Sequence, residues 1–353
     1  MRPPGARFLF PLILLAAVVL VVVSRSPLQI RDERLGIPRP VRYQPFRAEI
    51  MATTIQVLLP EGPEAPALAE SVFAVFREVD ARMSEWKPTS PLSAVNAAAG
   101  GEPVPVPADL REVLRKGMEV GAFTGGAFDI TWAALWGLWD FQAAEPRVPD
   151  SSLVARGVAR VDYRKVRIDH AAGTVFLPEA GMKLGLGGIA KGYALDRAAA
   201  VLGRRGVSSF LLMAGGQVYA GGTKNGMPWR VGIRDPRGAP DDYFAMLAVT
   251  DASVSTSGDY ESFFLAEGVR YHHILDPRTG MPSRTLRSAT VISHDATLAD
   301  ALSTAIMVMG GERGIALADS LSGVEAVVVD EVGSFRVTPG LEGRLEILHA
   351  PRS

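Results

Sequence analysis

The apolar positions of this chain follow two different periods, and each period predicts a different kind of element. Apolar residues three and four positions apart over 67–84 and 110–122 predict two helices that each bury one face. Short runs rich in β-branched and aromatic residues predict strands at 48–59, 167–168, 174–177, 209–213, 229–234, 245–250, 271–275, 289–293 and 324–329. Several of these strands follow one another with only turns between them. The order therefore favours an α+β fold of largely antiparallel sheets packed with helices over an alternating parallel sheet.

Turn and cap signals mark the ends of several expected elements. Asp109 is the expected N-cap of the second helix, because its short acidic side chain can accept a hydrogen bond from a first-turn N–H. A third helix is expected to follow the glycine-rich turn at 185–188 and to stop at Gly206. The segment 88–107 is predicted to be loop-rich, and the serines and glycine of 255–260 predict a turn that exposes hydroxyl groups.

The N-terminal segment has the pattern of an export signal. A short basic stretch precedes sixteen residues, Phe8 to Val23, that are all apolar apart from the interruption at Pro11. This run lies at the lower edge of a membrane span, for which ~20 residues are usual. No convincing small-residue cleavage site follows, so we expect an uncleaved signal anchor over 1–25, with a cleaved signal peptide as the alternative. The four prolines of 26–45 predict a spacer between the membrane and an extracytoplasmic domain.

Composition narrows the class of protein. With 353 residues and 48% hydrophobic content the chain can bury a substantial core. The 37 Lys and Arg residues balance 38 Asp and Glu residues, so the overall charge does not favour nucleic acid as a partner. The chain contains no cysteine, which excludes disulfides, thiolate metal ligands and a thiol nucleophile.

One apolar, helix-length run contains a single charge. Between Thr297 and Gly311 the only charged residue is Asp300, and Thr304 stands four positions later on the same helical face. A buried carboxylate needs a partner, because an unpaired one costs several kcal/mol. The carboxylate and the hydroxyl could together bind a hard cation. The alternative is a structural Asp that accepts hydrogen bonds from backbone amides or from an Arg.

The glycine-rich turn at 185–188 can bring backbone amides close to an anion. It satisfies the G-x-G-x-x-A pattern, but no acid ends the following strand as a dinucleotide-binding fold would require. The residues around Lys191 do not fit a P-loop either. A helix start beside Lys191 favours a phosphate group, whereas the alternative is a tight helix entry with a solvated lysine.

A histidine pair lies in the segment 270–280. On a strand, His272 and His273 point to opposite faces, so at most one of them faces a given pocket. A lone strand histidine is more often structural than catalytic. The residues that follow, Asp276 to Gly280, have the composition of a type I turn.

Taken together, these segments resemble the ApbE family, the FAD:protein FMN transferases. The matching stretches follow the family's order and cover roughly 48–337. They are Met83-Ser-Glu-Trp86 with Pro88 and Ser90, Gly126-Ala-Phe-Asp-Ile-Thr131, Gly187-Gly-Ile-Ala-Lys-Gly-Tyr-Ala-Leu-Asp196, Ser257-Gly-Asp-Tyr260, His273-Ile-Leu-Asp-Pro277 through Gly280, and Ala299-Asp-Ala-Leu-Ser-Thr304.

The resemblance implies a role for each matching position. FAD contacts map to Met51, Trp86, Ala127, Phe128, Asp129, Gly185, Lys191 and Ile274, with Met51 and Trp86 flanking the flavin. Magnesium ligands map to the carbonyl of Gly188 and to Asp300 and Thr304, with Ser303 as an additional position, and His273 matches the residue required for transfer.

Two positions depart from the family pattern. Gly185 stands where an Asp is common, and Gln217 stands where an acid is common. The first change removes a nucleotide contact that Asp196 or water could replace. The second could alter only a structural contact.

The expected activity is magnesium-dependent transfer of FMN from FAD to a Thr or Ser hydroxyl of an exported acceptor protein, with release of AMP. The expected acceptors are flavin-carrying subunits of membrane electron-transfer complexes. The resemblance places the catalytic domain at 46–340, followed by a C-terminal tail at 341–353. The alternatives are an FAD pyrophosphatase that gives FMN and AMP, a non-catalytic extracytoplasmic flavin-binding protein, and a plain binding module with a structural Asp300.

Overall fold

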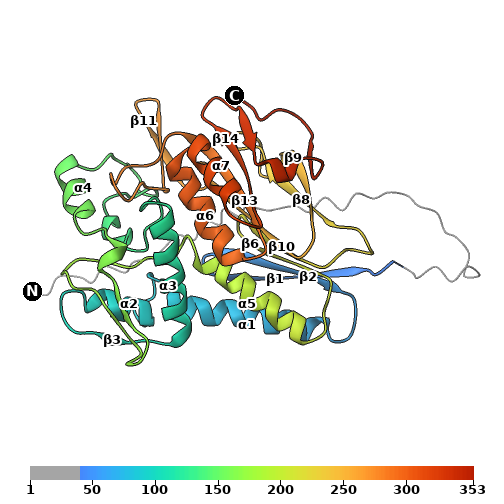
Figure 1. Cartoon of the computed structure of the whole chain (residues 1–353), viewed down its shortest axis with the longest axis horizontal. Coiled ribbons are helices and arrows are strands. Elements are labelled where there is room, and N and C mark those ends of the chain that lie inside the picture. Colours follow the sequence, from blue (N-terminus) through green and yellow to red (C-terminus); the bar gives the residue numbers. More distant parts are fainter. Residues whose placement is uncertain (1–39) are drawn as a thin grey trace, which may run out of the picture.

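The computed structural model describes residues 40–353, and its central element is an antiparallel sheet of eight strands (Figure 1). In spatial order the strands are β1 (Tyr43–Ile50), β2 (Thr53–Pro60), β6 (Phe210–Ala214), β7 (Gln217–Gly221), β10 (Ala252–Gly258), β13 (Leu286–Ser293), β14 (Val324–Asp330) and β15 (Phe335–Val337). Every neighbouring pair is antiparallel, which confirms the predicted α+β class.

Helices pack against one face of this sheet and against each other. They include α1 (Ala65–Met83), α5 (Ala190–Arg204), α6 (Ala296–Met309) and α7 (Gly311–Ser320). Figure 1 shows α1 and α5 side by side, and α6 lies between α5 and strands β10 and β13. The shorter helices α2 (Pro91–Ala97) and α4 (Ser151–Val158), together with α3 (Ala108–Phe123), lie to one side of this layer.

Smaller sheets complete the molecule. The sheet formed by β16 (Leu345–Ile347), β9 (Tyr243–Val249) and β8 (Trp229–Arg234) buries apolar residues against the other face of the large sheet. A separate hairpin joins β11 (Phe263–Ala266) to β12 (Val269–His272), and a three-stranded sheet joins β3 (Val104–Pro105), β5 (Thr174–Phe176) and β4 (Arg167–Asp169). The large sheet is thus covered by helices on one face and by β8 and β9 on the other.

Strand β10 serves these two faces with different side chains. Ser255 and Ser257 hydroxyls lie 3.4 Å and 2.8 Å from the hydroxyl of Ser303 on α6, so they point toward the helices. Val254 points the opposite way and joins the apolar core beneath β8 and β9. The period of two along a strand therefore puts oxygen atoms on the helix side and hydrocarbon on the other. The turn predicted for 255–260 is wrong over residues 255–258, because these lie in a central strand.

The structure corrects three further local predictions. The strand predicted at 48–59 is a hairpin, because the chain reverses at Met51 and Ala52, which both adopt positive φ values of 55° and 54°. Asp109 does not cap α3; the N-cap is Pro107, and Asp109 lies in the first turn. The loop-rich prediction for 88–107 missed helix α2, whose N-cap is Ser90. By contrast, α5 ends at Arg204 before Gly206 at φ 76°, as predicted.

The expected signal anchor at 1–25 and most of the spacer lie outside the described residues. Among residues 40–353, the structure holds no helix that is both long enough and apolar enough to cross a membrane. Residues 341–353, expected as a tail, contribute strand β16, which pairs with β9.

Candidate active site

Segments far apart in the sequence line one cleft with a volume of about 400 Å³. It lies where the helix layer meets the ends of β7 and β10. The predicted site residues that line it are Met51, Trp86, Ala127, Phe128, Asp129, Gly188, Lys191, His273, Ile274, Asp300 and Thr304. Only Gly185 and Ser303, among the residues proposed from the sequence, are not part of its lining.

Asp300 is held inside the protein by two donors. Its Oδ2 accepts a hydrogen bond from the backbone N–H of Gly192 at 2.9 Å, and its Oδ1 accepts one from Gln217 Nε2 at 2.6 Å. Burial raises the pKa of Asp300, while the charge of Lys191 acts in the opposite direction. These two hydrogen bonds are those expected of a structural Asp300. A carboxylate can accept about four hydrogen bonds or metal contacts, however, so further lone pairs stay available.

Hydroxyl groups surround the carboxylate. Thr304 Oγ1 lies 3.4 Å from Ser257 Oγ, and a Cβ on Gly188 would lie 3.1 Å from the same Thr304 oxygen. The absent side chain therefore lets the backbone at residue 188 approach Thr304 closely. Carboxylate, hydroxyl and carbonyl oxygens are the ligands that a hard cation such as Mg²⁺ prefers. Gly188, Asp300 and Thr304 therefore fit a hard-cation site, as the resemblance implied.

Ser303 does not line the cleft, unlike the other proposed metal ligands. Its side chain is fully buried, and its hydroxyl donates to the carbonyl oxygen of Asp300 at 2.8 Å, one turn earlier on α6. It also lies 2.8 Å from Ser257 Oγ. Ser303 thus connects α6 to β10 behind the residues that face the cleft.

The glycine turn places the positively charged side chain of Lys191 beside the same cleft. Lys191 lies in the first turn of α5, and its Nζ donates to the carbonyl oxygen of Gly187 at 2.8 Å. Two acidic residues that had no predicted role, Glu85 within the Trp86 motif and Glu261 after the Tyr260 motif, also line the cleft, and burial raises the pKa of each carboxyl group. Their only sequence signal is this position within or beside the two motifs.

The two histidines lie in different environments, although the strand predicted at 271–275 is β12 and ends at His272. His272 is buried; its Nδ1 accepts the N–H of Ile274 at 3.3 Å, so its Nε2 carries the proton and donates to the Ser283 carbonyl at 2.6 Å. His273 lines the cleft with an exposed ring, and its backbone N–H donates to the Ser262 carbonyl at 3.0 Å. Surrounding protein atoms and the neighbouring His272 lower the pKa of His273, so its imidazole is neutral near pH 7.

An exposed aromatic pair flanks the cleft. Trp86 is 62% exposed, and its ring meets Trp136 edge to face with the centroids 4.0 Å apart. Ser90, the N-cap of α2, donates to the Ser84 carbonyl at 2.7 Å and so fixes the short segment that carries Trp86. A large exposed indole at the wall of a cleft offers a stacking face for a planar ring.

Asp129 fastens the loop that it belongs to. Its Oδ1 accepts bonds from the Thr131 N–H and hydroxyl, and its Oδ2 accepts one from the Tyr163 N–H at 3.0 Å. Burial raises the pKa of this carboxyl group. The carboxylate therefore holds the 127–131 loop in shape, and Ala127 and Phe128 lie beside it in the cleft wall.

The two departures from the family pattern have separate consequences. Gly185 lies behind the cleft, where its carbonyl accepts from Trp132 Nε1 at 3.1 Å; a Cβ there would lie 2.7 Å from that nitrogen. It thus supports Trp132, which does line the cleft. Asp196, considered as a replacement for the lost acid, instead caps α6 by accepting from the N–H groups of Ala296 and Thr297. Gln217 lines the cleft and contacts Asp300 directly.

The fold and the cleft together define an α+β protein in which carboxylate and hydroxyl oxygens, a lysine and an exposed histidine line one cavity. The ApbE family model matches residues 51–328. The chain is 36% identical over 302 residues to an FAD:protein FMN transferase of Treponema pallidum, covering 81% of this chain and 83% of the relative. A Vibrio cholerae protein of the same name is 31% identical, covering 81% of this chain and 87% of the relative. The solved ApbE protein of Thermotoga maritima superposes with a TM-score of 0.79 at 33% identity, covering 86% of this chain and 99% of that one. The chain belongs to the ApbE family.

Proposed function

We propose that this protein is an FAD:protein FMN transferase that moves FMN from FAD to a Thr or Ser hydroxyl of an acceptor protein. Relatives of this name match most of the chain. The observation that carries the assignment is the single cleft in which His273, Lys191 and the Asp300–Thr304 oxygens lie together beside Trp86. Lys191 and a cation bound by the Asp300 and Thr304 oxygens would neutralise the pyrophosphate of FAD. Trp86 would stack on its flavin ring, and His273 would take the proton of the attacking hydroxyl group.

The cation site is proposed to hold Mg²⁺ through the Gly188 carbonyl, Asp300 and Thr304. When bound, the ion would neutralise charge on the FAD pyrophosphate. Lys191 supplies a further positive charge at the start of α5, where backbone N–H groups also favour an anion. Gly192 and Gln217 hold Asp300 in place through its two oxygens. Positioning of this kind is a large part of catalysis in phosphoryl transfer.

His273 is proposed as the general base. Its ring is exposed to the cleft and neutral near pH 7, so a ring nitrogen can take the proton of the acceptor hydroxyl. The hydroxyl oxygen then forms a bond to the phosphorus on the FMN side. The bond from that phosphorus to the bridging oxygen breaks, and AMP leaves with that oxygen. The product is an acceptor that carries FMN through a phosphoester.

The acceptor is proposed to be an exported protein. The apolar segment before residue 25 supports an enzyme that works on the extracytoplasmic side of a membrane, either anchored there or released after cleavage. Flavin-carrying subunits of membrane electron-transfer complexes have the required chemistry, because they hold FMN outside the cytoplasm. Fractionation of cells that express the full chain tests the location: activity confined to the cytosol contradicts it.

Coexpression with an acceptor tests the activity. Wild-type enzyme should give an acceptor with covalent flavin fluorescence and a mass increased by FMN minus water, whereas His273→Ala and Asp300→Ala should not. Unchanged labelling by both variants would reject the assignment. Removal of divalent cations with a chelator should stop labelling, and addition of Mg²⁺, Mn²⁺ or Ca²⁺ singly identifies the ion that restores it.

The same experiment separates the transferase from the alternatives. An FAD pyrophosphatase releases free FMN and AMP at the same rate with or without an acceptor. A flavin-binding protein without activity keeps FAD intact in the presence of magnesium. A module with a purely structural Asp300 binds no flavin.

A further inference from the structure

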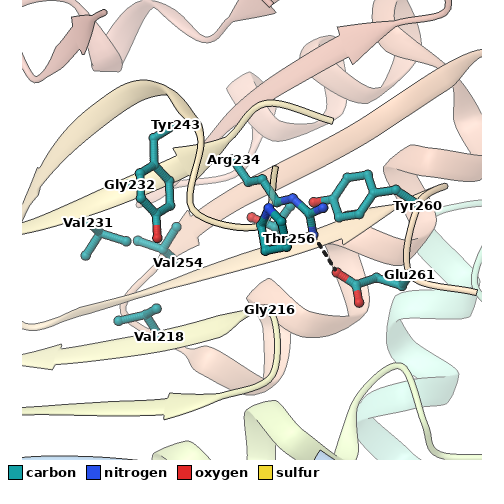
Figure 2. A pocket seen from close by; sticks show the side chains of 11 residues that line it. Gly216, Val218, Val231, Gly232, Arg234, Tyr243, Val254, Thr256, Tyr260 and Glu261 are labelled. Carbon is teal, nitrogen blue, oxygen red and sulfur yellow. Dashed lines mark ion pairs between the residues drawn. The ribbon is translucent and has the colours of Figure 1, made fainter. Parts of the chain in front are cut away.

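A second, smaller pocket lies between the large sheet and strand β8, on the face of the sheet opposite to α6. Figure 2 shows the residues that line it. Its wall includes three valines, Val218 on β7 and Val254 on β10 of the large sheet and Val231 on β8 of the covering sheet, and Gly232, Pro240 and Tyr243 also line it. Arg234, Tyr260 and Glu261 form its polar rim, as Figure 2 shows. We call this space the side pocket.

The side pocket adjoins the catalytic cleft. Gly216, Thr256 and Glu261 line both spaces. Glu261 is followed by Ser262, whose carbonyl oxygen accepts the backbone N–H of His273 at 3.0 Å. Gly216 makes the close approach here, because a Cβ on it would lie 2.9 Å from the Thr256 carbonyl oxygen. The side pocket therefore lies next to the segment whose backbone pairs with the proposed base.

The volume of the side pocket limits what can enter it. By the same measure the side pocket has about 40 Å³ and the cleft about 400 Å³. A single water needs roughly 10–15 Å³ on this measure, so the side pocket takes on the order of three or four non-hydrogen atoms. Neither an adenine nor a flavin ring fits such a space. A valine, threonine or alanine side chain does.

The rim offers a hydrogen-bond donor without an acceptor. The Arg234 guanidinium lies over the Tyr260 ring, 4.4 Å from its centroid, and 3.9 Å from the Glu261 carboxylate. Among the residues that the structure describes, the buried Nε of Arg234 has no hydrogen-bond partner. The buried Nε is closed to a ligand, but the Arg234 side chain is 22% exposed, so its terminal N–H groups can donate to a peptide carbonyl at the rim.

We propose that the side pocket binds the acceptor polypeptide. A small apolar or hydroxyl-bearing side chain next to the modified Thr or Ser enters between the three valines. A main-chain carbonyl of the acceptor accepts a hydrogen bond from the exposed terminal N–H groups of the Arg234 guanidinium. The flavin and adenine rings of FAD stay in the larger cleft, so the two substrates occupy adjoining spaces. This site rests on the proposed transferase activity and specifies how its protein substrate is selected.

The rim is tested with Arg234→Met, and Arg230→Met serves as the control. Arg230 lies on the same strand, but its side chain is exposed and pairs with Glu346 away from the pocket. The probe is an exported flavin-carrying subunit that wild-type enzyme labels in coexpression. Arg234→Met should raise KM for this acceptor roughly tenfold while kcat and the Kd for FAD stay within about twofold. Arg230→Met should leave all three values unchanged.

Two results overturn the site. An unchanged KM for the acceptor in Arg234→Met shows that the rim does not contact it. An equal weakening of FAD binding shows that the pocket belongs to the nucleotide. Failure of wild-type enzyme to label any exported acceptor is a different result, because it rejects the transferase activity itself.

The wall is tested by enlarging a side chain of the acceptor and shortening a side chain of the side pocket. Acceptor variants carry Leu in place of each residue that flanks the modified one, and they are labelled by wild type, Val254→Ala and Val249→Ala. Val249 is a buried control on β9 that does not line the pocket. One flanking position should be labelled poorly by wild type and recover at least about fivefold with Val254→Ala only. Equal labelling of every variant by all three enzymes overturns the proposal.

Discussion

Gln217 Nε2 donates to Asp300 Oδ1 at 2.6 Å, and this contact joins strand β7 to helix α6 beside the cleft. The orientation of the amide follows from the chemistry, because only its NH₂ group can face a carboxylate. Its other atom, Gln217 Oε1, is buried and has no hydrogen-bond partner among the described residues. A neutral side chain thus stands where an acid would put a second charge beside Asp300.

Replacing this amide by an acid should make the protein depend on its cation. In Gln217→Glu two carboxyl groups share one buried site, and without a cation one of them must hold a proton. We expect the cation-free variant to lose about 1–3 kcal/mol of unfolding free energy, because keeping one carboxyl group protonated at neutral pH costs about 1.4 kcal/mol for each pH unit above its pKa. Addition of Mg²⁺ should then raise its Tm by more than it raises that of the wild type. An equal Mg²⁺-induced shift in both proteins would contradict this expectation.

Gly192→Ala should separate helix α5 from helix α6. A Cβ at this position would lie 2.2 Å from the Ala296 carbonyl oxygen and 2.7 Å from Asp300 Cβ. Backbone atoms cannot rotate away, so we expect a loss of about 1–3 kcal/mol or more in urea unfolding. Gly203→Ala, in the same helix with nothing within 4 Å of its Cβ, is the control and should be neutral or stabilising. Similar stabilities for the two variants would show that the helices do not need this close approach.

Trp86→Ala should weaken flavin binding without weakening the fold. The indole is 62% exposed, so its removal should change the unfolding free energy by no more than about 0.5 kcal/mol. Loss of a stacking partner should raise the Kd for FAD by up to roughly tenfold. Trp86→Phe should recover part of this loss. Quenching of flavin fluorescence on binding gives the measurement, and undiminished quenching by Trp86→Ala would exclude stacking on this ring.

The acid limb of the pH profile should lie lower than for an ordinary histidine base. Surrounding protein and His272 lower the pKa of His273 from 6.5 to about 4, so the ring stays neutral as the pH falls through 6.5. The profile of kcat/KM reports groups of the free enzyme, and it should therefore remain flat to below pH 6 and decline only as the pH falls further. A decline centred at 6.5 or above would assign the limb to another group. His273→Gln should abolish transfer at every pH.

Long periodic elements were predictable from the sequence, because their apolar spacing depends only on which face is buried. Helices α1 and α3 and strand β8 are close to their predicted bounds. Strand β10 was not predicted, because its serines bond to α6 through hydroxyl groups and so lack the apolar signal of a core strand. The β1–β2 turn was also missed, since Met51 and Ala52 adopt positive φ without the usual Gly or Asn.

The residues of the candidate site also fall into those that a local motif indicates and those that only tertiary packing brings together. Short motifs identified most residues that line the cleft, because each motif holds its own local geometry. The bond from Gln217 to Asp300 spans 83 positions and could not be predicted from any local pattern. Trp132 and Glu261 were missed for the same reason, because tertiary packing brings them to the cleft wall, whereas Glu85 lies inside the Trp86 motif and had no predicted role.

Strand β10 carries hydroxyl groups of the cleft region on one face and core hydrocarbon on the other, so its pairing register determines both. A shift of one residue in its pairing would turn every side chain over, since alternate residues face opposite sides. Val254 would then enter the hydroxyl-lined space beside α6, and Ser255 would enter the apolar layer beneath β8 and β9. A misaligned chain would lose its catalytic centre and its core together. Chaperones and proteases that recognise exposed apolar side chains would therefore also remove the chains that are inactive.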